Sequence, residues 1–214
     1  DYRDAWGAFL RDFAAHNEAK GWRRRLSLVP YDEPRDPALF ARMAALAREC
    51  APGLLIAAAC DKDAHALAGA LDRAAVNLGV LRERPSLVQD LRARGIEPQW
   101  YNCMSPVWGN TLFASPLAEA WRMSWITKAG GLAGYLRWAI INWTDDPWHQ
   151  PAFNWPTGDM FLLYPGKTGP ASSLRWEAYK AGRSDLAVYL ANRRDEGPDA
   201  LLAELGSFEP APEP

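Results

Sequence analysis

Apolar positions along the chain follow two patterns that alternate with one another. Short, continuous apolar runs such as GLLIAAAC at 53–60 are typical of strands that are buried on both faces of a sheet. A second strand of this kind is predicted at 74–81. Alternating apolar residues predict a strand at 24–31, and further strands are predicted at 97–104 and 133–143, with a shorter extended segment at 161–166. The strands therefore recur along most of the chain.

The stretches between these runs carry apolar residues three and four positions apart, which predicts helices. In the first stretch Trp6, Phe9 and Phe13 share a face, and Gly21 follows as a C-cap. Later stretches open with residues that favour helix starts, such as Pro37 and Ser115. Helices are predicted at 2–20, 37–49, 63–73, 85–94, 115–131 and 173–194.

Alternation of helices and strands predicts an α/β fold with a parallel sheet. Neither G-x-G-x-x-G nor G-x-x-x-x-G-K-[ST] follows any predicted strand, which argues against a nucleotide-binding doubly wound fold. The alternative is a (β/α)8 barrel of the TIM type, which typically needs about 250 residues. The five predicted strands of this 214-residue chain would be the later part of such a barrel, roughly strands four to eight with their helices.

Composition and charge exclude several classes of function. The chain is 49% hydrophobic with a net charge of −2, so it carries no electrostatic footprint for nucleic acid or an anionic membrane. No apolar run reaches the roughly 18 residues that a membrane span needs. The sequence begins at Asp1 without a methionine, so we expect the true start upstream and predict no compartment.

Cysteine and histidine give no sign of a metal site. Cys50, Cys60 and Cys103 form no C-x-x-C pair and are expected as free thiols, largely buried. The three histidines are scattered singly, without the spacing of zinc ligands. We therefore expect no metal and no cofactor.

Tryptophan is the unusual component. The chain has 11 tryptophans, roughly four times the average usage for its length, and most lie between Trp100 and Trp176. Some of these tryptophans must belong to the core, and any single tryptophan considered by itself would be expected there. A cluster of this density also suggests a site that stacks flat ligands.

Acidic and aromatic residues stand at the ends of several predicted strands, where barrel enzymes keep their active sites. These strand-end residues are Tyr31-Asp32-Glu33, Cys60-Asp61, Trp100-Tyr101-Asn102, Trp138, Asn142-Trp143 and Asp145-Asp146. Taken singly, an Asp-Glu pair before Pro34 is an ordinary turn feature, and Asp145-Asp146 an ordinary solvated loop. Together they have the composition of a sugar site, in which aromatic rings stack on pyranose faces and carboxyls transfer protons.

Four separated motifs, in order, carry a more specific signal. The segments KGWRRRLSLVPYDEP (20–34), WYNCMSP (100–106), GYLRWAIINW with DPW (134–148), and GDMFLLYPG with SSLRWEAYKAG (158–182) resemble the catalytic domain of glycoside hydrolase family 123. The resemblance runs from about residue 1 to 192. It implies a (β/α)8 barrel and a retaining, substrate-assisted β-N-acetylhexosaminidase, most specifically an N-acetyl-β-galactosaminidase acting on glycosphingolipid-type glycans.

The resemblance also implies roles for individual residues. The 2-acetamido oxygen of the sugar attacks its own anomeric carbon, so two carboxyls are needed but no protein nucleophile. Asp32 would stabilise the acetamido group and Glu33 would act as acid and base. Tyr101 could hydrogen-bond the acetamido group, and Trp138 and Trp143 would wall the sugar subsite. Trp100 and Asn102 are further substrate-binding candidates, although alternate residues of a strand face away from the lumen.

The match begins at the helix before the fourth barrel strand. Strands one to three and any N-terminal β-sandwich would then come from an upstream segment or another chain. Residues 1–196 are expected to form the C-terminal portion of the barrel, and 197–214 an extension that is partly disordered. Two other functions stay open: a non-catalytic carbohydrate-binding relative, and a glycosidase of another specificity that pairs Glu33 with a carboxylate such as Asp61 or Asp145.

Overall fold

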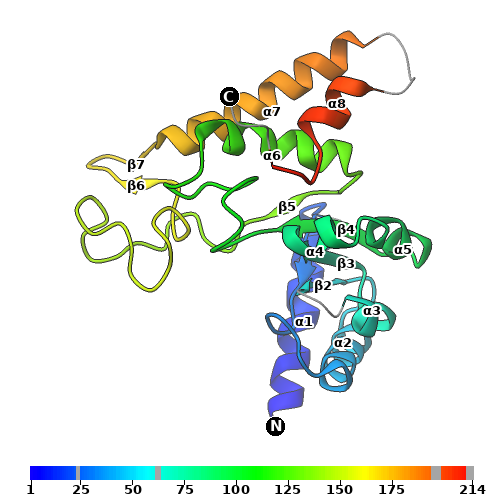
Figure 1. The fold of residues 1–214 in the computed structure, drawn as a ribbon. Helices are drawn as coiled ribbons and strands as arrows, with labels where there is room; N and C mark the ends of the chain where they lie inside the picture. Colours follow the sequence, from blue (N-terminus) through cyan, green and yellow to red (C-terminus); the bar gives the residue numbers. More distant parts are fainter. Residues whose placement is uncertain (23–24, 61–63, 194–198, 211–214) are drawn as a thin grey trace.

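Five parallel strands form one sheet and follow each other in chain order (Figure 1). The computed structural model describes residues 1–22, 25–60, 64–193 and 199–210. Within these ranges the strands are β1 (Ser27–Leu28), β2 (Leu55–Cys60), β3 (Arg73–Asn77), β4 (Glu97–Tyr101) and β5 (Tyr135–Leu136). Each strand pairs in parallel with the next, so the sheet is an open half-barrel, as the sequence predicted.

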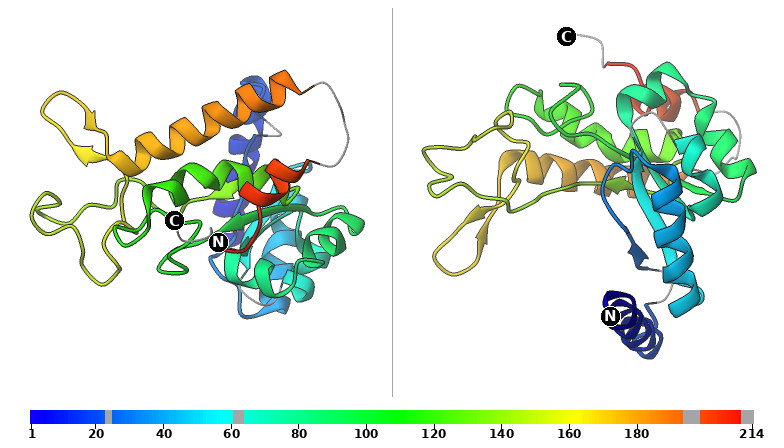
Figure 2. Two further views of the ribbon diagram at one scale, coloured as in Figure 1. Left: turned by 45° about the horizontal axis from the view of Figure 1, so that its top comes forward. Right: turned by 90° about the horizontal axis from the view of Figure 1, so that it is seen from below.

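Helices connect the strands and cover one face of the sheet. They are α1 (Tyr2–Ala19), α2 (Pro37–Cys50), α3 (Ala64–Leu67), α4 (Leu78–Glu83), α5 (Leu87–Ala93), α6 (Leu117–Ala129), α7 (Leu174–Asn192) and α8 (Ala200–Leu205), with a 3-10 turn η1 (Ala68–Ala70). Side-chain caps begin several of them: Asp36 accepts from the backbone N–H of Leu39 over 2.9 Å at the start of α2. Helices α6 and α7 run side by side in the two views of Figure 2.

Several predicted boundaries were wrong, and two of them have a clear local reason. The strand predicted at 74–81 ends at Asn77, because the Asn77 side chain accepts from the N–H of Gly79 over 2.8 Å and caps α4. The helix predicted at 63–73 ends at Ala70. Asp72 instead binds the N–H of Ile56 through its carboxylate over 2.8 Å, which ties it to β2.

The strands pack their two faces very differently. The face toward the helices carries large apolar side chains, among them Ile56, Val76 and Trp100, which join the main core. The opposite face, which would line the lumen of a complete barrel, holds a small cluster of Ala59, Ala75 and Tyr101 against Leu136. Alternation along β4 therefore sends Trp100 to the helices and Tyr101 to the lumen.

The sheet is strongly curved. Arg73 of β3 donates to the Ser27 hydroxyl of β1 over 2.9 Å and pairs with Glu97 of β4 at 3.3 Å. Strands β1 and β3 are separated by β2, so in a flat sheet their axes would be about 10 Å apart. One arginine therefore links three strands across the lumen face near their amino ends.

A long segment leaves the sheet after β5. The strand predicted at 133–143 pairs with β4 only at Tyr135 and Leu136. Residues 137–163 then form loops at the carboxyl end of the sheet, with one isolated antiparallel bridge between Ile141 and Phe161. The chain returns through a small hairpin, β6 (Tyr164–Pro165) and β7 (Pro170–Ala171), before α7 begins.

The C-terminal segment docks on α6. Arg122 of α6 donates to the backbone carbonyls of Leu205, Ser207 and Glu209, and it also pairs with Glu119 at 3.2 Å. The sequence did not predict helix α8, whose last turn packs against α6. Of the extension expected at 197–214, residues 197–198 and 211–214 lie outside the described residues.

Candidate active site

The Asp-Glu pair lies in a turn between β1 and α2. The turn is held by Tyr31, whose hydroxyl donates to the carbonyl of Asp36 over 2.9 Å and whose ring packs edge-on against Phe40. Pro34 is buried beneath it, while the side chains of Asp32 and Glu33 are exposed. Because β1 ends at Leu28, the alternation of strand side chains does not force the two carboxyls to opposite faces.

Glu33 has an unusual backbone conformation. Its φ of 41° lies in the left-handed region, and it is the non-glycine residue with positive φ among the described residues. Such a conformation is uncommon for a residue with a side chain and recurs at functional sites. The turn therefore presents Glu33 in a direction that an extended backbone would not give it.

Tyr101 meets Glu33 across the lumen. The Tyr101 hydroxyl lies 3.2 Å from Glu33 Oε1 and donates a hydrogen bond to it. In a flat sheet the axes of β1 and β4 would be about 14 Å apart, so the contact depends on the curvature of the half-barrel. The structure thus brings together Glu33 and Tyr101, two residues selected from the sequence for one site, with Asp32 adjacent to Glu33.

Trp100 and Asn102 lie elsewhere. Trp100 is fully buried, and its indole N–H donates to the Thr127 hydroxyl of α6 over 2.8 Å. Asn102 is also fully buried; its amide donates to the carbonyl of Gly109, and its oxygen accepts from the Tyr135 hydroxyl over 2.8 Å. Both face the helix side, because they flank Tyr101 on alternate positions. Their side chains stabilise the end of β4. The prediction that they bind substrate was therefore wrong.

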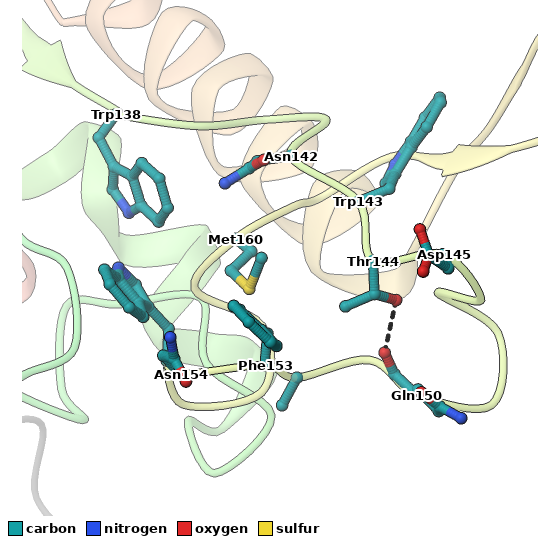
Figure 3. Close-up of a pocket in the computed structure, with 11 residues that line it drawn as sticks. Trp138, Asn142, Trp143, Thr144, Asp145, Gln150, Phe153, Asn154 and Met160 are labelled. Atoms are coloured by element: carbon teal, nitrogen blue, oxygen red, sulfur yellow. Dashed lines mark hydrogen bonds between the residues drawn. The ribbon is translucent and has the colours of Figure 1, made fainter.

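An open cavity of about 590 Å³ lies in the loops that follow β5 (Figure 3). Its lining residues are Trp138, Asn142, Trp143, Thr144, Asp145, Gln150, Ala152, Phe153, Asn154, Trp155 and Met160. The ring centroids of Trp138 and Trp155 are 6.2 Å apart, and their exposed fractions are 41% and 40%. The cavity therefore combines half-exposed aromatic faces with amide groups, a combination suited to sugar rings and hydroxyls.

Trp143 stands at the rim of this cavity. In Figure 3 its ring points away from Trp138 and Met160, while the Trp138 ring points toward Met160. The Trp143 indole N–H donates to the backbone carbonyl of Leu163 over 2.7 Å. On the same side of the cavity, the hydroxyl of Thr144 donates to the carbonyl of Gln150 over 2.7 Å and closes the loop between them.

Sequence reasoning named Trp138, Asn142, Trp143 and Asp145 of the cavity but missed its other residues. Phe153 and Trp155 belong to the Pro- and Trp-rich stretch that followed the last predicted strand. That composition was the available signal, because tryptophans in a polar loop have no core to enter. The side chains of Gln150 and Asn154 carried no comparable signal.

Two buried arginines fix the loop beneath the cavity. Arg137 donates to the carbonyls of Ala139, Gly158 and Asp159, and Arg175 of α7 donates to those of Thr111, Gly158 and Phe161. Both therefore bind the Gly158 carbonyl. This shared acceptor connects the start of the loop, at Arg137, with the first turn of α7, at Arg175.

The carboxylate of Asp159 is the acidic partner in this buried region. It is fully buried and lies 3.5 Å from the Arg137 guanidinium. Burial raises the pKa of Asp159, and the charge of Arg137 opposes that shift. Cys103 connects this region with the catalytic candidates, since burial raises the pKa of its thiol and the charges of Asp159 and Glu33 raise it further. Asp159 and Glu33 therefore both act on the thiol that follows the end of β4.

The remaining acidic candidates are split. Asp145 lines the cavity. Asp146 forms an exposed pair with His149 at 2.9 Å, and this hydrogen bond lowers the pKa of Asp146. Asp61 lies outside the described residues. Among residues that the structure does describe, no group of three or more His, Cys, Asp or Glu is placed to hold a metal ion.

Every helix in the described ranges is too short or too polar to span a lipid bilayer. No curated protein matches the chain. Among solved structures, the fold is similar to that of a family 123 glycoside hydrolase from Clostridium perfringens, studied for glycolipid glycan hydrolysis, with a TM-score of 0.74 and 22% identity.

That likeness covers 97% of this chain but only 38% of the Clostridium protein, consistent with an incomplete barrel. At 22% identity it establishes the fold alone. The sequence itself, however, matches the family described as "Glycoside hydrolase 123, catalytic domain" over residues 1–189, which is most of the chain. The chain therefore belongs to the glycoside hydrolase 123 family, as the motifs around Asp32, Tyr101 and Trp138 indicated.

Proposed function

We propose that this chain carries both catalytic carboxyls of a retaining, substrate-assisted β-N-acetylhexosaminidase that removes a terminal β-linked N-acetylgalactosamine from glycans. The observation that carries the proposal is the contact of Tyr101 with Glu33 over 3.2 Å, with Asp32 adjacent. It shows a carboxyl at the carboxyl end of the sheet, on the lumen side, where barrel enzymes bind substrate.

Glu33 is assigned to proton transfer. In the first step its carboxyl protonates the glycosidic oxygen, while the acetamido oxygen of the sugar attacks the anomeric carbon and the aglycone leaves. In the second step the Glu33 carboxylate takes a proton from water, which opens the oxazolinium ion at the same carbon. Two inversions at that carbon give overall retention.

Asp32 is assigned to the acetamido group. Its carboxylate would accept the acetamido N–H and offset the positive charge that develops on the oxazolinium ring. An adjacent pair suits this division, because both carboxyls address the same face of one sugar. Tyr101 is proposed to bind the acetamido group in the complex, its hydroxyl holding Glu33 when no substrate is present.

The aromatic cavity is assigned to the sugar. Trp138 presents a half-exposed face on which the apolar side of a pyranose ring can stack, and Trp143 closes the rim. The amides of Asn142 and Asn154 are the candidates for binding ring hydroxyls. A complete barrel needs three further strands before β1. We propose that an upstream segment or another chain supplies them.

A substrate panel tests the sugar and the mechanism together. The full-length protein would be assayed on the chromogenic β-glycosides of N-acetylgalactosamine, N-acetylglucosamine and galactose. We expect hydrolysis of the first, and inhibition by a thiazoline analogue of the oxazolinium ion. Activity on plain galactoside alone would overturn the acetamido mechanism, since that sugar has no group to attack.

A glycosidase with a protein nucleophile is the second candidate, and one observation favours it. Asp145 lines the aromatic cavity and is a carboxylate available to oppose Glu33. A nucleophile of this kind requires a carboxyl separation of about 5 Å in the complex. Such an enzyme would hydrolyse the plain galactoside, resist the thiazoline and lose activity in Asp145→Asn. A non-catalytic carbohydrate-binding relative would instead bind the glycosides without turnover.

A further inference from the structure

Two exposed tryptophans are fixed in place beside the cavity. The indole N–H of Trp143 donates to the carbonyl of Leu163 over 2.7 Å, and that of Trp148 donates to the carbonyl of Pro165 over 3.3 Å. Their exposed fractions are nevertheless 38% and 56%. Each polar N–H is thus satisfied by the backbone, which leaves a ring face open to solvent.

An aromatic stack anchors the outer of these rings. Phe161 is fully buried and meets Tyr164 edge-on, with ring centroids 5.0 Å apart. Tyr164 in turn lies against Trp148, with centroids 4.5 Å apart and planes 33° from parallel. The stack runs from the core to the surface, so packing on Tyr164 fixes the orientation of the exposed Trp148 ring.

The two rings continue from the cavity. Leu163 and Pro165, which hold them, are two residues apart, so their backbone positions lie no more than about 7 Å from each other. Trp143 also lines the cavity, and in Figure 3 its ring points outward from the cavity's centre. An aromatic surface of Trp143, Trp148 and Tyr164 thus extends from the proposed sugar subsite toward the β6–β7 hairpin.

The charge of the residues around this aromatic surface indicates which kind of ligand it can bind. Residues 138–165 contain three aspartates but no lysine or arginine, and the β6–β7 hairpin contributes a single lysine, Lys167. Surfaces that bind anionic lipids or nucleic acid carry basic residues, so neither partner fits. Neutral sugar rings fit better, because their apolar faces stack on aromatic rings and their hydroxyls need no countercharge.

We propose that Trp148, backed by Tyr164 and joined to the cavity by Trp143, forms a subsite for the glycan beyond the scissile bond. Its ligand is a neutral pyranose ring of the aglycone, which stays on the protein while the terminal sugar is cleaved. This inference rests on the proposed function, because the position of the scissile bond defines which side of the substrate is the aglycone.

The test compares two substrates with the same terminal sugar. One is an aryl β-N-acetylgalactosaminide, which has no sugar aglycone, and the other a soluble neutral tetrasaccharide ending in β-N-acetylgalactosamine. In Trp148→Ala, we expect the ratio of kcat/KM for the tetrasaccharide to kcat/KM for the aryl glycoside to fall about tenfold, mostly through KM. Trp148→Phe, which keeps a ring on Tyr164, should restore much of the ratio. Val188→Ala, at an exposed apolar position of α7, should leave the ratio at the wild-type value.

Other outcomes overturn the subsite. An equal loss on both substrates would mean that Trp148 only supports the loop. A loss confined to the same glycan on a lipid anchor in phosphatidylcholine vesicles, with the soluble tetrasaccharide unaffected, would mean that the ring contacts a membrane. If the wild-type protein hydrolyses neither substrate, the proposed function fails, and calorimetric binding of the tetrasaccharide to wild type and Trp148→Ala decides the subsite alone: weaker binding in the variant supports it, and equal binding overturns it.

Discussion

The Tyr101 hydroxyl donates a hydrogen bond to Glu33 over 3.2 Å, although the two residues are 68 positions apart and two strands, β2 and β3, lie between their places in the sheet order. The contact joins the end of β4 to the turn that follows β1. It follows from sheet curvature, from the placement of Tyr101 on the lumen face, and from the left-handed backbone at Glu33.

Tyr101→Phe removes the hydrogen bond while keeping the ring that packs on Ala59 and Ala75. In the substrate complex the lost hydroxyl can no longer bind the acetamido group, and a neutral hydrogen bond contributes about 0.5–1.5 kcal/mol. We therefore expect kcat/KM for the aryl N-acetylgalactosaminide to fall roughly 2- to 12-fold. The thermal midpoint should change little, and a large drop in it would show that Tyr101 is mainly structural.

Trp100 and Trp138 should respond to substitution in opposite ways. Trp100→Ala opens a hole in the core, so we expect the free energy of unfolding to fall by about 3–5 kcal/mol. Trp138→Ala, at a half-exposed position, should leave unfolding nearly unchanged and raise KM. Urea unfolding and steady-state kinetics on both variants check this. If a folded Trp100→Phe variant raised KM as much as Trp138→Ala does, Trp100 would have to be part of the substrate site.

Asp159→Asn should change the pH dependence of stability. Burial raises the pKa of Asp159 above its ordinary value of 3.8, so the folded state binds more protons than the unfolded state between the two pKa values. The stability contributed by Asp159 is therefore complete below 3.8 and is lost as pH rises through the raised pKa. Asparagine does not titrate, so the destabilisation relative to wild type should shrink from pH 4 to pH 7. Urea midpoints at both values measure it, and a growing destabilisation would contradict the assignment.

Gly182→Ala should disrupt the contact between α6 and α7. A Cβ at Gly182 would lie 1.8 Å from the backbone carbonyl oxygen of Trp121, so the helices must separate. Overpacking of this kind costs about 1–3 kcal/mol and occasionally more, and we expect the upper end because backbone cannot rotate aside. Gly169→Ala is the control, since its Cβ would meet nothing within 4 Å. Equal thermal midpoints for the two variants would refute this packing.

The sequence predicted the elements better than their ends. Apolar runs and alternation located the five strands, and the signal was continuous in β2 and β3, where most residues are buried. The end of β3 depended instead on one capping side chain, Asn77, and the end of β5 on the backbone carbonyls bound by Arg137. Both depend on contacts that a hydrophobic pattern does not record.

Residues of the candidate site could be predicted from the sequence where they belong to a family motif or stand at the end of a predicted strand. Asp32, Glu33 and Tyr101 followed from the motifs and strand ends, but which of Trp100, Tyr101 and Asn102 faces the lumen depended on register. The role of Arg175, far along the chain on α7, could not be read from sequence, because it acts through carbonyls of two separate loops. The same holds for α8, whose place is set by Arg122.

The most direct test of the account is the dependence of Glu33→Gln on the leaving group. In the full-length protein, kcat/KM would be measured on the 4-nitrophenyl and 4-methylphenyl β-N-acetylgalactosaminides, beside Asp32→Asn and the exposed control Glu83→Gln. General acid catalysis contributes about 10²- to 10⁴-fold, and a good leaving group needs less of it. We predict that Glu33→Gln loses far more on the methylphenyl substrate, that Asp32→Asn loses similarly on both, and that Glu83→Gln loses on neither. Equal losses of Glu33→Gln on the two substrates would contradict the assignment of Glu33 as the acid.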